Sequence, residues 1–205
     1  GHFISALSNG HYVIGSPDWD NGATSNVGAV TWRDGTVPTT GVVSPANSLI
    51  GTSANDRVGF QILPQEFGQY SVVSQYWNGN LGALTVCDDS APCLGTVSAA
   101  NSWVGNTVGD FDGVQFYYDP SAMPTLLPSL PNGNFLARLI NWDSPNEVDA
   151  GAILIGNSQN FGAVNATTAV VGDKTGDLGW MTSPLALPNG DVILYARAWD
   201  NGAIA

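Results

Sequence analysis

The side chains best suited to chemistry are carboxylates in a short turn. Asp18-Trp19-Asp20-Asn21-Gly22 approaches the D-x-D-x-[DN]-G pattern of a calcium loop, in which oxygen atoms coordinate the ion. Its glycine falls one position early, and the corresponding turns that begin at Tyr76, Asn141 and Ala198 carry fewer carboxylates. Two interpretations stand: Asp18 and Asp20 bind calcium, or they close turns by accepting backbone hydrogen bonds.

A tryptophan recurs at one position in four similar segments. Each lies seven residues after an aromatic or β-branched residue, and the four are Trp19, Trp77, Trp142 and Trp199. Exposed aromatic faces at regular intervals would form a multivalent platform for glycans. A residue repeated in every unit also suits core packing between neighbouring units, and we favour this structural interpretation.

Two cysteines, Cys87 and Cys93, lie six positions apart. A disulfide between them would close a small loop and would indicate an oxidising compartment, whereas two reduced thiols inside a sheet would fit the same spacing. Zinc is not expected, because only His2 and His11 could complete a site and neither lies at ligand spacing.

Paired carboxylates of the kind used by glycosidases occur at Asp88-Asp89 and at Glu147 with Asp149. No segment supplies a distinctive nucleophile, and no histidine is placed to serve as a general base. We therefore expect that the chain is not an enzyme. Asn165-Ala166-Thr167 fits an N-glycosylation acceptor, a tripeptide that is common by chance.

These residues belong to a unit of about sixty residues that recurs along the chain. The segment around Tyr12 recurs at Tyr70, Phe135 and Val192, and Asp56 recurs as Asp110 and Asp177. We expect these three aspartates to cap turns by accepting nearby backbone N–H groups. We expect the recurrent glycines, which include Gly51 and Gly105, where the backbone needs positive φ or a close approach between strands. Approximate units are 1–58, 59–118, 119–178 and a partial unit 179–205. A Pro-rich insertion over 119–131 lengthens the third unit and is expected to protrude as a loop.

Each unit predicts four short strands, which in the first unit lie before Leu7 and over 12–16, 28–32 and 41–50. Asn-Gly pairs, as at 9–10, favour tight hairpins, and the 25 glycines and 12 prolines oppose helices. The predicted fold class is therefore all-β, a repeat of four-stranded units. Such units most resemble β-propeller blades, with a β-solenoid or stacked-sheet repeat as the alternative.

The composition excludes several partners. The net charge is −12 and only five Lys and Arg residues occur, so binding to nucleic acid is not expected. Membrane insertion is not expected either, because no apolar run approaches the roughly 20 residues that cross a bilayer. Charged residues make up 11%, well below the ~25% of an ordinary soluble domain, which favours an extracellular or cell-surface location.

The repeated motifs suggest a family. The first unit contains SNGHYVIGSPDWDNG, GAVTW, GVVSPANSLIG and NDRVG. This pattern resembles the repeats of large bacterial surface proteins related to filamentous haemagglutinin, and more distantly the FG-GAP blades of integrin α-subunit propellers. The resemblance covers essentially the whole chain and implies a secreted or surface-displayed fibre or adhesin segment. It identifies no ligand.

We therefore expect a non-enzymatic extracellular structural or adhesive repeat module, of which a fibre or assembly subunit would be one form. It needs no cofactor unless calcium binds. Its expected partners are other copies of itself or adjoining repeats, and glycans or a host surface. The first half of the unit occurs four times and the second half three times, so we expect either a longer protein or completion by another copy. The alternative function is a lectin-like, carbohydrate-binding propeller.

Overall fold

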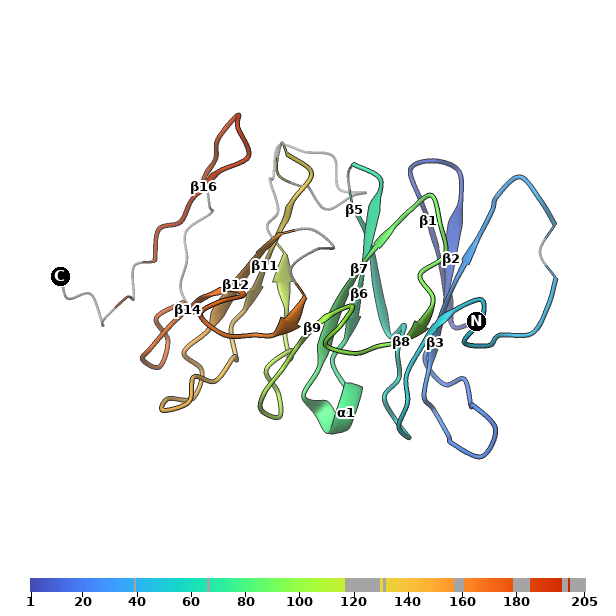
Figure 1. Ribbon diagram of the computed structural model, residues 1–205, viewed down its shortest axis with the longest axis horizontal. Coiled ribbons are helices and arrows are strands. Elements are labelled where there is room, and N and C mark those ends of the chain that lie inside the picture. The colour runs from blue at the N-terminus through green and yellow to red at the C-terminus, as the bar shows by residue number, and fades with distance from the viewer. Residues whose placement is uncertain are drawn as a thin grey trace.

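The computed structural model describes residues 1–38, 40–65, 67–116, 130, 132–156, 161–178, 185–196 and 199. Nearly all regular structure in these residues is β-strand, which confirms the all-β prediction, and the sheets lie side by side along the long axis (Figure 1). The strands are β1 (Phe3–Ala6), β2 (Tyr12–Ser16), β3 (Ala29–Arg33), β4 (Leu49–Ile50), β5 (Gln61–Gln65), β6 (Gln69–Ser74), β7 (Ala83–Asp88), β8 (Gly95–Thr96), β9 (Trp103–Val104), β10 (Gln115–Phe116), β11 (Phe135–Leu139), β12 (Ala152–Gly156), β13 (Gly162–Ala163), β14 (Val170–Val171), β15 (Leu185–Ala186) and β16 (Val192–Ile193).

Each of the first three sheets contains four antiparallel strands. Their orders are β1-β2-β3-β4, β5-β6-β7-β9 and β10-β11-β12-β14, and β15 pairs with β16 in a fourth, two-stranded sheet. The predicted hairpin at Asn9-Gly10 joins β1 to β2, with Gly10 at a φ of 88° and the Asn9 side chain accepting a hydrogen bond from the His11 N–H. The short helical element α1 (Trp77–Asn80) is a tight turn, because Asn78 and Gly79 have positive φ.

The strand predicted over 41–50 is wrong in extent, since only Leu49–Ile50 forms a strand. The side chain of Asn47 closes a turn before it: its Oδ1 accepts the Ser44 N–H at 2.9 Å, and its Nδ2 donates to the Val42 carbonyl at 2.8 Å. These bonds satisfy backbone groups that a longer strand would have paired. Asn101 makes the same turn in the second unit.

Consecutive units also share strands. β8 of the second unit pairs in parallel with β4 of the first, and β13 of the third pairs in parallel with β9 of the second. The first two sheets therefore have five strands, the fifth supplied by the next unit along the chain. Backbone hydrogen bonds thus tie each unit to its successor.

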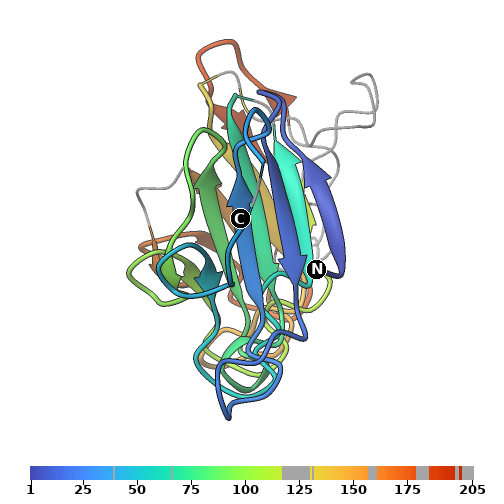
Figure 2. The same cartoon turned by 90° about the vertical axis from the view of Figure 1, so that its right-hand side faces the viewer.

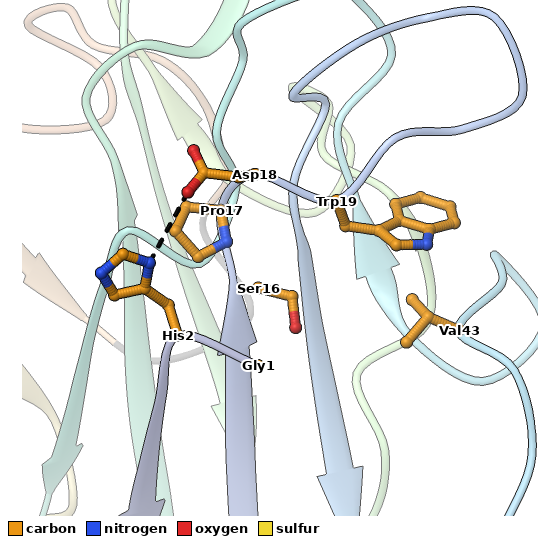
Figure 3. Close-up of a pocket in the computed structure, with 7 residues that line it drawn as sticks. All are labelled: Gly1, His2, Ser16, Pro17, Asp18, Trp19 and Val43. Carbon is orange, nitrogen blue, oxygen red and sulfur yellow. Dashed lines mark ion pairs between the residues drawn. The ribbon is translucent and has the colours of Figure 1, made fainter.

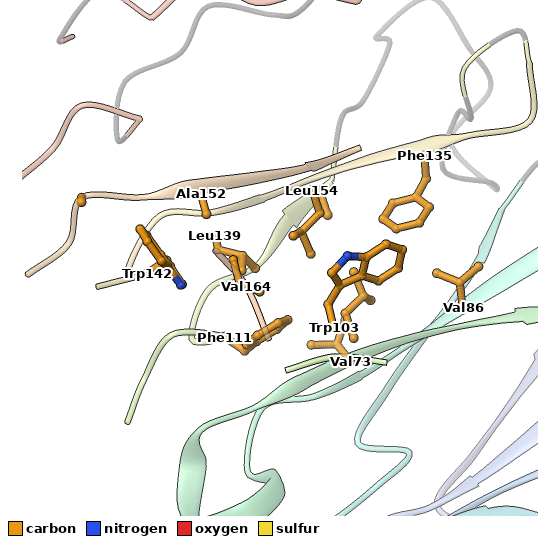
Figure 4. Close-up of a cluster of buried hydrophobic side chains, with 13 residues drawn as sticks. Val73, Val86, Trp103, Phe111, Phe135, Leu139, Trp142, Ala152, Leu154 and Val164 are labelled. Atoms are coloured by element: carbon orange, nitrogen blue, oxygen red, sulfur yellow. The ribbon is translucent and has the colours of Figure 1, made fainter. Parts of the chain in front are cut away.

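The core lies between the sheets, whose strands run in similar directions when viewed from the end of the row (Figure 2). In the second sheet β7 is buried along five successive residues, because neighbours cover both of its faces. In the first sheet β2 alternates between buried and partly exposed residues, as expected for a sheet covered on one face. One apolar cluster fills the first junction, and a second cluster, around Trp103, Phe111 and Phe135, fills the next (Figure 4).

The predicted protruding loop at 119–131 lies outside the described residues, apart from Leu130, which is buried. Among the described residues, no helical segment has the length and hydropathy of a membrane span.

Candidate functional site: the junctions between repeats

The recurrent aspartate of the first unit is a buried hydrogen-bond acceptor. Asp56 is 1% exposed, and its Oδ2 accepts the N–H groups of Thr52 and Ser53, each at 2.8 Å. Its Oδ1 accepts the N–H of Asn78, which belongs to the second unit, at 2.8 Å. A single carboxylate therefore closes its own turn and binds the backbone of the next unit.

Asp110 repeats this arrangement at the next junction. It is fully buried, and its Oδ2 accepts the N–H groups of Asn106 at 2.7 Å and Thr107 at 2.9 Å. Its Oδ1 accepts the Thr107 hydroxyl at 2.6 Å and the N–H of Asp143, in the third unit, at 3.1 Å. Asp177 closes the equivalent turn, accepting from Asp173 and Lys174. The predicted capping role of these aspartates is confirmed, and the bond to the next unit is new.

We call Asp56 and Asp110 the junction aspartates. The two amides that they bind across the junction, those of Asn78 and Asp143, directly follow Trp77 and Trp142. The recurrent aspartate and the recurrent tryptophan are thus the two sides of one contact between sheets. Each repeats because the contact repeats.

The four repeated tryptophans differ in exposure according to their place in the row. Trp142 is 2% exposed and packs in the cluster between the second and third sheets (Figure 4). Trp77 is partly buried against the cluster between the first two sheets. Trp19 is also partly buried, whereas Trp199 is 39% exposed. Trp77 and Trp142 act in packing, whereas Trp199 presents much of its surface.

Recurrent glycines make room for the junction aspartates. A Cβ on Gly51 would lie 2.3 Å from the Val27 carbonyl oxygen and 2.7 Å from Cβ of Asp56, and Gly105 is equally crowded beside Asp110. The backbone therefore approaches the aspartate more closely than any side chain would allow. The predicted need for glycine at these positions is confirmed.

The two candidate calcium ligands lie in the turn after β2. The Oδ1 of Asp20 accepts the N–H of Asn26 at 2.7 Å, and Asp18 lies 3.6 Å from His2 and 3.8 Å from Arg57. Asp143 closes the matching turn of the third unit. Within the described ranges, no group of three or more acidic, histidine or cysteine side chains gathers as a metal site would require. Asp20 therefore has a structural role in its turn, and calcium binding stays a prediction.

Cys87 and Cys93 form the predicted disulfide, with their Cα atoms 5.7 Å apart. The loop that it closes holds Asp89, whose carboxylate accepts hydrogen bonds from Ser8 at 3.0 Å and Asn9 at 2.8 Å. The Asp89 carbonyl accepts from Nε1 of Trp32 at 2.7 Å. The disulfide loop therefore binds the first hairpin to the second unit, a contact that the sequence did not predict.

Two of the carboxylates considered for glycosidase chemistry, Asp88 and Glu147, accept hydrogen bonds from other side chains. Asp88 accepts hydrogen bonds from the hydroxyl and the N–H of Ser90, and these bonds lower the pKa of Asp88 below its usual value. Glu147 accepts the hydroxyl of Thr175 at 3.3 Å.

A cavity of about 480 Å³ opens beside the second junction. Trp142, Pro145, Val164 and Val171 give it an apolar lining, and Asn106 lies at its polar rim. The indole of Trp142 is almost wholly buried there, so it offers little face on which a sugar could stack.

An all-β array of similar sheets, the first three of which are joined through the same aspartate, defines a repeat protein. The chain belongs to the family described as Repeat of unknown function (DUF5650), whose model matches it three times, over residues 6–60, 65–114 and 129–179. Each match contains the last three antiparallel strands of one of the first three sheets: β2, β3 and β4 in the first match, β6, β7 and β9 in the second, and β11, β12 and β14 in the third. None of the curated proteins with which the chain was compared matches it.

Proposed function

We propose that the chain is a non-enzymatic structural or adhesive repeat module of an extracellular or surface-displayed protein. The observation that carries this proposal is the junction aspartate, which connects successive sheets in the same way at two junctions. The residues that recur most regularly thus contribute to the cohesion of the array. A module whose repeated residues serve cohesion is suited to a mechanical role.

The disulfide and the composition support the location. Cys87 and Cys93 are bonded, and such bonds persist outside the reducing cytosol. The low content of charged residues, 11%, is in keeping with a surface formed from uncharged polar side chains. The resemblance to haemagglutinin-related repeats belongs to this proposal and suggests a fibre or an adhesin.

The comparison of each sheet with a propeller blade is likewise part of the proposal. Four antiparallel strands in chain order, as in β1-β2-β3-β4, support it. The pairing of β8 and β13 with strands of the preceding sheet supports the stacked-sheet alternative, because each of these strands extends the contact along the row. Class averages of negatively stained particles would separate a ring from a straight stack.

Location is tested on intact cells that produce the protein. We expect a protease added outside the cells to remove the protein, and the peptides containing Cys87 and Cys93 to be disulfide-linked by mass spectrometry without reduction. Protection from the protease, together with free thiols in freshly alkylated cells, would contradict the proposal. A cytosolic protein followed in the same digestion serves as the control for cell integrity.

A carbohydrate-binding role is the second candidate, and Trp19 is the residue that favours it. Trp19 lies beside Val43 in an open cavity of about 350 Å³, with His2 and Asp18 on another side (Figure 3). On a glycan array we expect any binding to be lost in Trp19→Ala. Binding that survives this substitution would rule out Trp19 as the site.

A further inference from the structure

At the N-terminal end of the row, the first sheet exposes a face whose counterparts in the second and third sheets are covered by the preceding sheet. In the first sheet Ile4 lies opposite Ile14, and in the second sheet Ile62 lies opposite Val72. The two pairs occupy equivalent positions in the repeat. Ile62 is 8% exposed and Val72 is fully buried, because the first sheet packs on them. Ile4 is 69% exposed and Ile14 is partly exposed.

Two aromatic residues on that side of the first sheet also correspond to residues that pack in the later sheets. Tyr12 occupies the place of Tyr70, which is fully buried against the first sheet. Trp19 occupies the place of Trp77 and Trp142, and it borders the open cavity of Figure 3 rather than a closed core. The β1–β2 part of the outer side thus carries the counterparts of the residues with which the second sheet binds its predecessor. Farther across the same side, Thr31 and Ile50 are already buried within the chain, and Arg33 stands where the second sheet has Cys87.

The other end of the row has a complementary apolar surface. Val192 and Leu194 pack towards the third sheet, together with Leu136 and Ile153. Leu185 and Ile193 are paired across β15 and β16 and are 59% and 52% exposed. Neighbouring residues of a strand point to opposite faces, so Ile193 faces away from the array.

We propose that these two end faces bind each other, so that copies of the chain associate head to tail, with β15–β16 of one copy on the outer face of β1–β2 of the next. This inference rests on the proposed structural function and specifies its partner. Inside the chain, each junction places the later face of one sheet on the earlier face of the next. Head-to-tail contact continues that arrangement, whereas a symmetric dimer would place two identical faces together.

Charge sets the conditions under which the contact forms. Each copy carries a net charge of −12, so copies repel one another at low ionic strength. Salt screens this repulsion and leaves apolar contacts intact, so association should strengthen as sodium chloride is raised.

The test uses three single variants of the 205-residue chain in sedimentation velocity. Ile4→Asp blocks one face, Ile193→Asp blocks the other, and Val108→Asp is the control, because Val108 is also 69% exposed but lies in a turn of the second unit. We expect the unmodified chain and the control to form larger species as concentration rises. Each face variant alone should associate about tenfold or more weakly, since a carboxylate would be buried in an apolar contact.

A mixture of Ile4→Asp and Ile193→Asp decides the geometry. Each variant keeps one intact face, so head-to-tail binding predicts dimers that grow no further. Loss of association in Ile4→Asp alone, with Ile193→Asp unaffected, would show a symmetric contact and overturn the inference. An unmodified chain that stays monomeric in high salt would also overturn it, while the proposed structural role would still be tested by the stability of the junctions.

Discussion

Replacing Asp110 by asparagine tests the junction directly, because the side chain keeps its shape and loses its charge. The amide oxygen can still accept the N–H groups of Asn106 and Thr107. The amide nitrogen then faces the N–H of Asp143, which donates at 3.1 Å in the native protein. Two donors meet, and the bond to the third unit is lost.

The expected loss of stability follows from that bond. A hydrogen bond to a charged group contributes about 1.5–3 kcal/mol, and a buried donor left without an acceptor costs a similar amount. Asp110 is fully buried, so water cannot readily replace the acceptor. We therefore expect Asp110→Asn to lower the free energy of unfolding by about 2–3 kcal/mol, a large part of the roughly 5–15 kcal/mol that stabilises a typical domain.

Urea denaturation followed by tryptophan fluorescence measures this loss. Asp112→Asn is the matched control, since Asp112 is exposed and lies two residues away in the same turn. The control should change the free energy of unfolding by no more than about 0.5 kcal/mol. If Asp110→Asn were as stable as Asp112→Asn, the bond from the Asp143 N–H to Asp110 would contribute nothing to stability, contrary to its proposed role.

Other expectations concern packing, the disulfide and a buried phenol. Trp142→Ala should cost about 3–5 kcal/mol in urea denaturation, against about 1 kcal/mol or less for the exposed Trp199→Ala; equal losses would contradict the packing role. Reduction of Cys87–Cys93 should lower the free energy of unfolding by about 2 kcal/mol, from the entropy of the small loop, and an unchanged urea midpoint would count against this. Burial raises the pKa of Tyr70 above its ordinary value of 10.0, so the stability that depends on its protonated form is complete below that pH and falls as the pH rises further. When the free energy of unfolding is compared at about pH 8 and 11, Tyr70→Phe should lack this fall. A fall of the same size in both proteins would disprove this expectation.

Local features of the fold could be predicted from the sequence. β2 and β3 coincide with runs of β-branched residues between turn signals, and the turn aspartates follow from the hydrogen bonds that short acidic side chains make with nearby N–H groups. The strand expected to begin at Gly41 failed, because Val42 and Val43 suit a strand but Asn47 closes a turn behind them.

Contacts between units could not be predicted. Asp110 and Asp143 are 33 residues apart, and their contact depends on how two sheets stack. The pairing of β4 with β8 joins two strands of two residues each, which are too short for a recognisable pattern. One feature of the sequence does indicate the contact between units: the tryptophan and the aspartate recur together in every complete unit.

A buried hydroxyl pair shows a further signal of this kind. The hydroxyl oxygens of Thr85, in β7, and Ser102, directly before β9, lie 2.7 Å apart, and Thr31 with Ser48 forms the same pair in the first sheet. The third sheet has Leu154 and an alanine at this register. Both polar residues change together, because one hydroxyl alone in the core would cost free energy.

A buried carboxylate holds the first sheet to the second, and another holds the second to the third, each through a backbone N–H. Amide hydrogen exchange in the native protein tests these two contacts most directly. Asn78 and Asp143 lie in turns, where exchange is normally fast, yet their N–H groups donate to Asp56 and Asp110. We expect these two amides to exchange as slowly as the amides of the core strands β7 and β12. Exchange at the rate of an exposed turn would contradict it.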